Sequence, residues 1–332
     1  MRAFALPLLL ASLLASVLAS TAIGSVRVPL DTVVKGLLGI RVEGLASTVI
    51  DLRLVRTVAA LLSGASLGAA GAILQSLFRN PLADPFVLGI SSGSSLAIAA
   101  TLIAGTGLGL ISSYDPQALY VAGALGAFAV SLAVVALSSL VRSSLGLVLV
   151  GVMLGYLASG LTTLLVVTSD AERIRAFTFW TLGTFSASKW SVLTPVLPLA
   201  LASLIASSLV AKPLNALLFG EESAASMGVS LRASRVGAVA VSASLVSASV
   251  VVSGPVGFIG LAAPHAVRLL LRSEDNRVIV PLSAVFGANL AILSDIAART
   301  LLSPIELPVT AITSLFGAPT IVLLVLRRWG FR

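Results

Sequence analysis

The sequence predicts an all-α, polytopic membrane protein that forms a single domain over residues 1–332. Composition is the first reason: 58% of the residues are hydrophobic, 10% are charged and the mean hydropathy is +1.09, whereas soluble domains carry about 25% charged residues. The second reason is that the apolar runs are long and unbroken. Backbone groups in lipid must be hydrogen-bonded within helices or a closed barrel, and runs without period-two alternation favour helices.

About ten spans are expected, because a helix crosses ~30 Å of hydrocarbon at ~1.5 Å per residue. They lie at 3–23, 54–78, 86–108, 118–140, 146–168, 191–211, 235–253, 256–271, 278–298 and 309–326. The run at 256–271 is short and contains Pro264 and His265, so whether it crosses fully is left open. The first run has the basic start of a signal peptide but is longer than a signal core, and we expect it to be retained.

The most informative segment is residues 53–93, which predicts a transmembrane hairpin. Arg53 and Arg56 open an uncharged apolar run, a polar break RNPLADP follows, and a second apolar run starts at once. The break contains Pro81 and Pro85, which cannot continue a helix. We therefore expect a rigid polar turn at one face of the membrane.

The basic residues are predicted to flank the membrane rather than to bind nucleic acid. The net charge is +8, but the Lys and Arg residues are scattered through loops and helix ends. Ten spans place both termini on one side, which holds twelve Lys and Arg residues against nine on the other; this favours cytoplasmic termini. The chain has no cysteine, which excludes disulfides, thiol nucleophiles and thiolate metal sites.

The segment 53–93 resembles the BtuC/FecCD-type permeases, which belong to binding-protein-dependent ATP-binding-cassette importers of iron-siderophores, haem and vitamin B12 (cobalamin). The matching positions are Arg53, Arg56, Gly64, Gly71, Gln75, Asn80, Pro81, Leu82, Ala83, Pro85, Leu88, Gly89, Ser91, Ser92 and Gly93. The sequence departs from the family at Val55, where proline is usual, and at Ser94, where alanine is usual. Neither departure removes a charge or a turn residue.

A second block of the resemblance extends it over nearly the whole chain. It comprises GPVGFIGLAAPHAVRLLL at 254–271, SDIAAR at 294–299, ELP at 306–308, FGAP at 316–319, and the tryptophan–glycine pattern Trp180, Gly183 and Trp190. Thr310 and Thr320 depart from the family, where glycine and phenylalanine are common.

The resemblance implies a type II importer permease fold in the inner (plasma) membrane, and a transport subunit rather than an enzyme. The implied partners are a second copy of the chain in a homodimer, two cytoplasmic ATP-binding subunits, an extracytoplasmic substrate-binding protein and membrane lipid. No cofactor is expected in this chain, because ATP and Mg would be bound by the partner ATPase. The substrate stays open among iron-siderophore, haem, cobalamin and molybdate-type oxyanions.

The resemblance also implies that Arg53, Arg56 and Arg299 meet carboxylates of the binding protein, which the planar guanidinium pairs bidentately. Two alternatives stay open. Arg299 has Asp295 one helical turn earlier as a partner, and Arg53 and Arg56 are also placed as interfacial anchors beside Asp51.

A polar inner loop at about 212–234 is expected to contact the ATPase. The coupling residues that the resemblance implies are Glu221, Glu222, Ala225 and Gly228, in a short helix ended by glycine; the alternative is an ordinary amphipathic loop. The implied cytoplasmic gate comprises Asn80, Leu82, Ser143 and Ser144. Small residues at four-residue spacing, namely Ala60, Gly64, Gly68 and Ala72, and Gly151, Gly155, Ser159 and Thr163, predict close helix packing.

Other functions fit the sequence less well. Residues 89–93 match G-x-S-x-G, but they open a membrane helix rather than follow a strand, as a hydrolase requires. No G-x-x-x-x-G-K-[ST] occurs, so a P-loop for ATP is excluded. The alternative function is an ion-coupled secondary transporter, which usually needs ionisable groups at mid-membrane; the expected spans hold almost none, and Asp295 lies near the end of its span.

Overall fold

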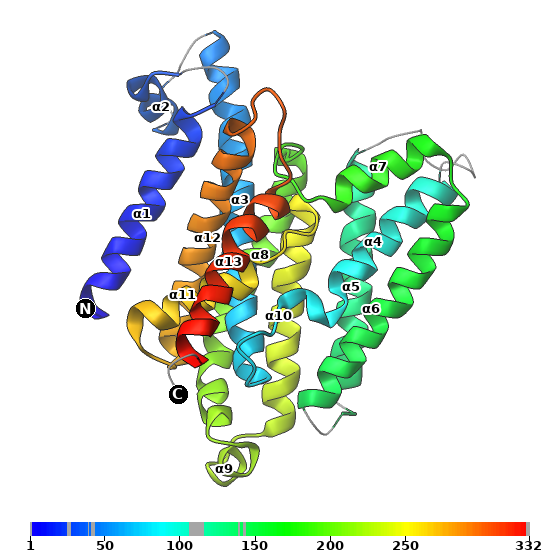
Figure 1. Ribbon diagram of the computed structural model, residues 1–332, viewed down its shortest axis with the longest axis vertical. Helices are drawn as coiled ribbons and strands as arrows, with labels where there is room; N and C mark the ends of the chain where they lie inside the picture. The colour runs from blue at the N-terminus through cyan, green and yellow to red at the C-terminus, as the bar shows by residue number, and fades with distance from the viewer. Residues whose placement is uncertain are drawn as a thin grey trace.

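The computed structural model describes residues 2–24, 28–38, 40, 44–105, 116–138, 140–141 and 144–329, and every regular element in them is a helix (Figure 1). The expected spans correspond to α1 (Arg2–Ala22), α3 (Leu45–Leu77), α4 (Ile90–Ala100), α5 (Pro116–Ser138), α6 (Ser144–Val167), α8 (Trp190–Leu218), α10 (Leu231–Ser253), α11 (Ile259–Leu271), α12 (Asn276–Thr300) and α13 (Val309–Trp329). The remaining elements are short: α2 (Leu30–Leu37), η1 (Pro85–Leu88), η2 (Thr101–Gly105), α7 (Ala171–Thr181) and α9 (Glu221–Ser226). The all-α class is confirmed.

Not every expected span is a full-length helix. By length and composition, α3, α6, α8, α10 and α12 suffice to cross a membrane. Helix α11 has 13 residues, or about 20 Å, and therefore does not cross ~30 Å of hydrocarbon alone. Helix α4 has 11 residues, and the short helical segments η1 and η2 lie at its two ends.

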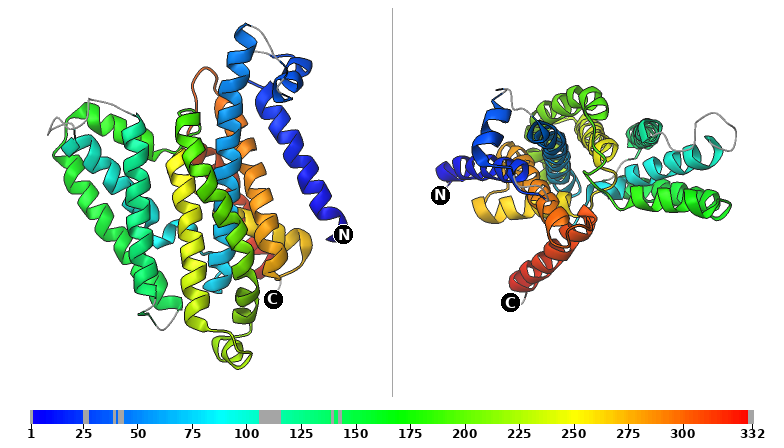
Figure 2. Two further views of the ribbon diagram at one scale, coloured as in Figure 1. Left: turned by 180° about the vertical axis from the view of Figure 1, so that it is seen from behind. Right: turned by 90° about the horizontal axis from the view of Figure 1, so that it is seen from above.

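Helix α3 is the centre of the bundle (Figures 1 and 2). It packs against α8, α10, α11 and α12, and α1 lies outside this group against α12. Helices α4, α5 and α6 form a second group, which joins the first through contacts of α10 with α5. The short helices α2 and α7 lie at one end of the bundle and α9 lies at the opposite end; we call these the α7 end and the α9 end.

Small residues allow α3 to occupy this position. Gly64 and Gly68 are buried on the face toward α12, where a Cβ atom on either would clash with a backbone carbonyl, that of Gly287 or of Ser283 respectively. The expectation of close packing along this face is therefore confirmed. On α6, the predicted stripe packs against the start of α4, where the hydroxyl of Ser159 donates to that of Ser92 at 3.3 Å.

Helices α3 and α8 extend furthest beyond their expected spans, and tertiary contacts explain the extension of α8. Helix α3 begins at Leu45 instead of residue 54, and α8 continues to Leu218 instead of ending at 211. Leu214 and Leu217 on the added turns of α8 are buried at 0% and 2% exposure, and their burial stabilises the helix beyond Pro213. The polar loop expected at 212–234 is consequently reduced to α9 and the turns beside it.

Candidate functional site

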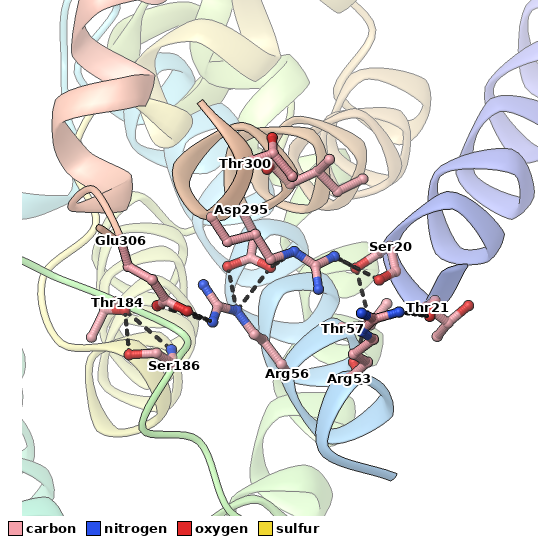
Figure 3. A network of polar contacts seen from close by, with 12 residues as sticks. Ser20, Thr21, Arg53, Arg56, Thr57, Thr184, Ser186, Asp295, Thr300 and Glu306 are labelled. Atoms are coloured by element: carbon pink, nitrogen blue, oxygen red, sulfur yellow. Dashed lines mark hydrogen bonds and ion pairs between the residues drawn. The ribbon is translucent and has the colours of Figure 1, made fainter. Parts of the chain in front are cut away.

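Three arginines gather at the α7 end, where α1, α3 and α12 meet (Figure 3). Arg53 and Arg56 come from α3, and Arg299 comes from the last turn of α12. Arg53 is 7% exposed, Arg299 is 9% exposed, and the side chain of Arg56 is 11% exposed. The residues predicted to face a binding protein are therefore brought together, but they are largely covered by their own chain.

Two of these arginines cap the end of α1. Arg53 Nη1 donates to the carbonyl oxygens of Thr21 at 3.1 Å and Ala22 at 2.9 Å. Arg299 Nη2 donates to the carbonyl oxygen of Ser20 at 2.6 Å and to its hydroxyl at 2.9 Å. The last four carbonyls of a helix lack intrahelical partners and carry the negative end of its dipole. Arg53 and Arg299 therefore satisfy these carbonyls and fix α1 against α3 and α12.

Arg56 joins two carboxylates from distant parts of the sequence (Figure 3). Its Nε donates to both oxygens of Asp295, at 2.8 and 3.0 Å, and its Nη1 donates to both oxygens of Glu306, at 2.9 and 3.1 Å. Asp295 has a fully buried side chain, whereas that of Glu306 is 45% exposed. A buried pair is costly to break because it leaves an uncompensated charge, and an exposed pair contributes little. Arg56 is therefore bound strongly by the buried Asp295 and weakly by the exposed Glu306.

Of the alternative contacts predicted for these arginines, the structure contains the pair of Arg299 with Asp295. Arg299 Nε lies 3.6 Å from Asp295, one turn earlier on α12, so that alternative partner is present. Asp51 instead accepts a hydrogen bond from the indole nitrogen of Trp190 at 3.1 Å, which joins α3 to α8. The contacts of Arg56 with Asp295 and Glu306 span 239 and 250 residues, and no local pattern in the sequence signals them.

The α9 end presents the candidate coupling residues. Glu221 pairs with Arg235 of α10 at 2.6 Å, whereas Glu222, Ala225 and Gly228 are exposed. Gly228 ends the element at a φ of 82°, which favours glycine. The short helix ended by glycine that the sequence predicted is therefore present at 221–228.

Two large apolar side chains flank α9, and the sequence analysis did not single them out. Phe219 is 76% exposed and Met227 is 56% exposed, on either side of the six-residue helix. Exposed apolar residues within a polar rim are typical of protein–protein contacts. This end of the bundle therefore carries a compact surface suited to a partner.

The turn after α3 is rigid, as the sequence predicted. Asn80 Oδ1 accepts from the backbone N–H of Leu82 at 2.9 Å, and the N–H of Asn80 itself donates to the carbonyl of Gln75 at 3.1 Å. Leu82 is 56% exposed at this turn. Of the other gate candidates, Ser143 lies outside the described residues, and Ser144 is the first residue of α6. The structure thus places two of the gate candidates, Asn80 and Leu82, in the turn that follows α3.

The G-x-S-x-G segment has a helical context. Gly89 ends η1 at a φ of 72°, and residues 90–93 form the first turn of α4. A nucleophile elbow requires a strand before the serine, and a helical turn precedes it instead.

Comparison with known proteins places the chain among transport proteins. The model of the FecCD transport family matches residues 12–327. The ABC transporter permease protein YvrB of Bacillus subtilis is 35% identical over 94% of this chain and 90% of its own length. The hemin transport system permease protein HmuU of Yersinia pestis is 37% identical over 84% of this chain and 83% of its own. The vitamin B12 import system permease protein BtuC of Klebsiella pneumoniae is 37% identical, over 84% and 82% respectively.

A solved structure shares the fold over the whole length. It is described as an inward-facing conformation of a transporter assigned to the metal-chelate type of ABC transporter. The two chains superpose with a TM-score of 0.85 at 30% sequence identity, and the match covers 98% of this chain and all of the other.

Proposed function

The chain belongs to the FecCD transport family, and from this premise we propose that it is the permease subunit of a binding-protein-dependent ATP-binding-cassette importer for a metal chelate. The observation that carries the proposal is the family match over residues 12–327, which includes all or part of every apolar helix of the bundle. The hemin and vitamin B12 permeases among its relatives support an iron-siderophore, haem or cobalamin type of substrate.

The proposed importer is a homodimer. Helix α6 presents a row of exposed apolar side chains, namely Leu149, Met153, Tyr156, Leu157, Leu164 and Val167. Lipid or a second copy would cover such a row, and we assign part of the apolar surface to the copy. Cyclic two-fold symmetry is the commonest arrangement of homo-oligomers, and it would place a transport pathway between the two subunits.

We assign the α9 end to two cytoplasmic ATPase subunits. Glu222, Ala225 and Gly228, with Phe219 and Met227, would contact the ATPase, while the pair of Glu221 with Arg235 would hold α9 against α10. ATP and Mg would bind the partner, because the sequence has no P-loop. This orientation places both termini in the cytoplasm and the α7 end on the outer side of the inner membrane.

We assign the α7 end to the substrate-binding protein. Arg56 would meet the partner, because its Nη1 pairs with Glu306, whose side chain is 45% exposed. Arg53 and Arg299 would support Arg56 by fixing α1 and α12 around it. Complementary charge at such a contact mainly speeds and orients docking.

An ion-coupled secondary transporter is the second candidate, and the buried Asp295 is the observation that favours it. A carboxylate within a membrane span is a functional candidate by default. Here, however, Asp295 forms ion pairs with the guanidinium groups of both Arg56 and Arg299, and its side chain is fully buried. A coupling carboxylate must be reached by an ion from water during transport, so the geometry supports the importer better.

The test is ATPase activity in proteoliposomes that contain this chain and its candidate ATPase. The candidate binding protein is added empty, and then loaded in turn with ferric siderophore, haem, cobalamin and molybdate. The proposal expects stimulation by one loaded form. If the chain fails to assemble with any ATPase, the importer function is refuted and the secondary transporter becomes the favoured function.

A further inference from the structure

Four helices meet in a polar junction at the α9 end. It consists of Asn215 on α8, Asp275 and Asn276 at the start of α12, Ser76 on the last turn of α3, and Arg268 on α11. None of these residues belongs to the surface assigned above to the ATPase.

Asn215 joins α8 to α12 through both ends of its amide. Its Nδ2 donates to the carboxylate of Asp275 at 2.6 Å, and its Oδ1 accepts from the backbone N–H of Asn276 at 2.7 Å. Asp275 also caps α12 by accepting from the N–H of Arg277. Hydrogen bonds from the Arg277 side chain and from Asn215 hold the pKa of Asp275 well below its usual range, so this carboxylate is charged at neutral pH.

The junction continues from α12 to α3. Asn276 Oδ1 accepts a hydrogen bond from the hydroxyl of Ser76 at 2.6 Å, and Arg268 Nη2 donates to the same hydroxyl at 3.4 Å. The carbonyl of Ser76 accepts from the N–H of Arg79, in the turn that follows α3. The side chains of Asn276 and Ser76 are buried. Ser76 therefore connects the start of α12 to the rigid turn that carries Asn80 and Leu82.

The junction is also close to α9 in the sequence, through Asn215 near the end of α8. Only Phe219 and Gly220 separate α8 from α9, and both continue the backbone hydrogen bonding of α8, with donation to Ala216 and Leu217 at 3.2 Å each. A displacement of α9 therefore moves the last turn of α8, and with it Asn215.

We propose that Asn215, Asn276 and Ser76 are positioning residues that transmit movement of α9 through α8 and α12 to the end of α3 and its turn. The inference rests on the proposed function, because it assigns a path between the ATPase surface and the gate candidates in the turn that follows α3. The junction does more than cap a helix, because Asn215 of α8 and Ser76 of α3 both bind the start of α12.

The experiment compares two serine-to-alanine variants on the same helix. Ser76→Ala removes the bond from α3 to α12. Ser66→Ala is the matched control, because Ser66 is equally buried on α3 and its hydroxyl has no partner among the described residues. Both variants are assembled with the ATPase and the loaded binding protein in proteoliposomes. Uptake of chelate per ATP hydrolysed is measured, with thermal unfolding as the check on folding.

The inference predicts that Ser76→Ala lowers uptake per ATP by about threefold or more, while Ser66→Ala leaves the ratio at the wild-type value. Asn215→Ala is expected to lower the same ratio. The double variant should fall no further than the stronger single variant, because both changes interrupt one series of contacts. A purely structural role would lower the melting temperature without changing the ratio.

Any of three results would overturn the inference: that Ser76→Ala retains the wild-type uptake per ATP, that Ser66→Ala lowers this ratio as much as Ser76→Ala does, or that the effects of Ser76→Ala and Asn215→Ala multiply. In each of these cases the wild-type complex still imports, so the proposed function stands. Absence of ATP-driven uptake by the wild-type complex is a different outcome, which refutes the proposed function and the inference with it.

Discussion

Replacing Asp295 by asparagine should destabilise the bundle far more than replacing Glu306 by glutamine, although both carboxylates bind the same guanidinium group. Asp295 is fully buried and contacts two arginines, so its neutralisation leaves the buried Arg299 without an ionic partner among the described residues and Arg56 with Glu306 alone. Removing one member of a buried pair costs ~3–5 kcal/mol. Asparagine keeps one oxygen to accept from Arg56 Nε, so we expect the lower end, about 3 kcal/mol.

Glu306 pairs with Arg56 at the surface, with 45% of its side chain exposed. An exposed pair contributes ~0–1 kcal/mol, so Glu306→Gln should cost at most about 1 kcal/mol. At ~2.1 cal/mol/K of unfolding entropy per residue, a chain of 332 residues loses about 1.4 °C of melting temperature per kcal/mol. Asp295→Asn should therefore melt about 4 °C below the wild type.

The assay is thermal unfolding of the detergent-solubilised chain, followed by the intrinsic fluorescence of its tryptophans at low salt and at high salt. Salt should reduce the small effect of Glu306→Gln and leave that of Asp295→Asn nearly unchanged, because exposed pairs are screened and buried pairs are not. Equal melting temperatures for the two variants, or a wild-type value for Asp295→Asn, would refute this account of the network.

Three further changes test other parts of the structure. Gly64→Leu should abolish stable packing of α3 on α12, because any side chain there meets a backbone carbonyl; Gly160→Leu, at a position with open space in the described structure, should be purified and melt like the wild type. Combined replacement of Phe219 and Met227 by serine should weaken ATPase binding about tenfold or more in a pull-down titration, with an unchanged melting temperature, and undiminished binding would contradict the assigned surface. The depressed pKa of Asp275 means that its stabilising contribution is present above the unfolded-state pKa of about 3.9 and is lost as pH falls further; the melting-temperature difference between wild type and Asp275→Asn should therefore be constant from about pH 7 to about pH 5 and shrink towards about pH 3.

The apolar helices could be predicted from the sequence because burial in lipid demands long apolar runs, and those runs are local. The small-residue face of α3 was predictable for the same reason, since the spacing of Gly64 and Gly68 lies within one helix. The pair of Arg299 with Asp295 was also within reach, because the two residues lie one turn apart.

The contacts that build the two ends were beyond local reasoning. Arg56 finds Glu306 across 250 residues, and Arg53 binds carbonyl groups, which carry no side-chain signal in a sequence. The continuation of α8 past Pro213 depends on burial of Leu214, which only the assembled bundle provides. The sequence thus predicted which residues are polar at each end, and the structure supplied their partners.

The most direct test of the central claim is accumulation of labelled chelate in proteoliposomes that contain the complete complex, with ATP supplied to the ATPase side. The account predicts uptake that requires ATP, the ATPase and the loaded binding protein, and that continues when ionophores collapse proton and sodium gradients. Uptake by this chain alone, driven by an ion gradient and insensitive to ATP, would contradict the importer function and identify a secondary transporter.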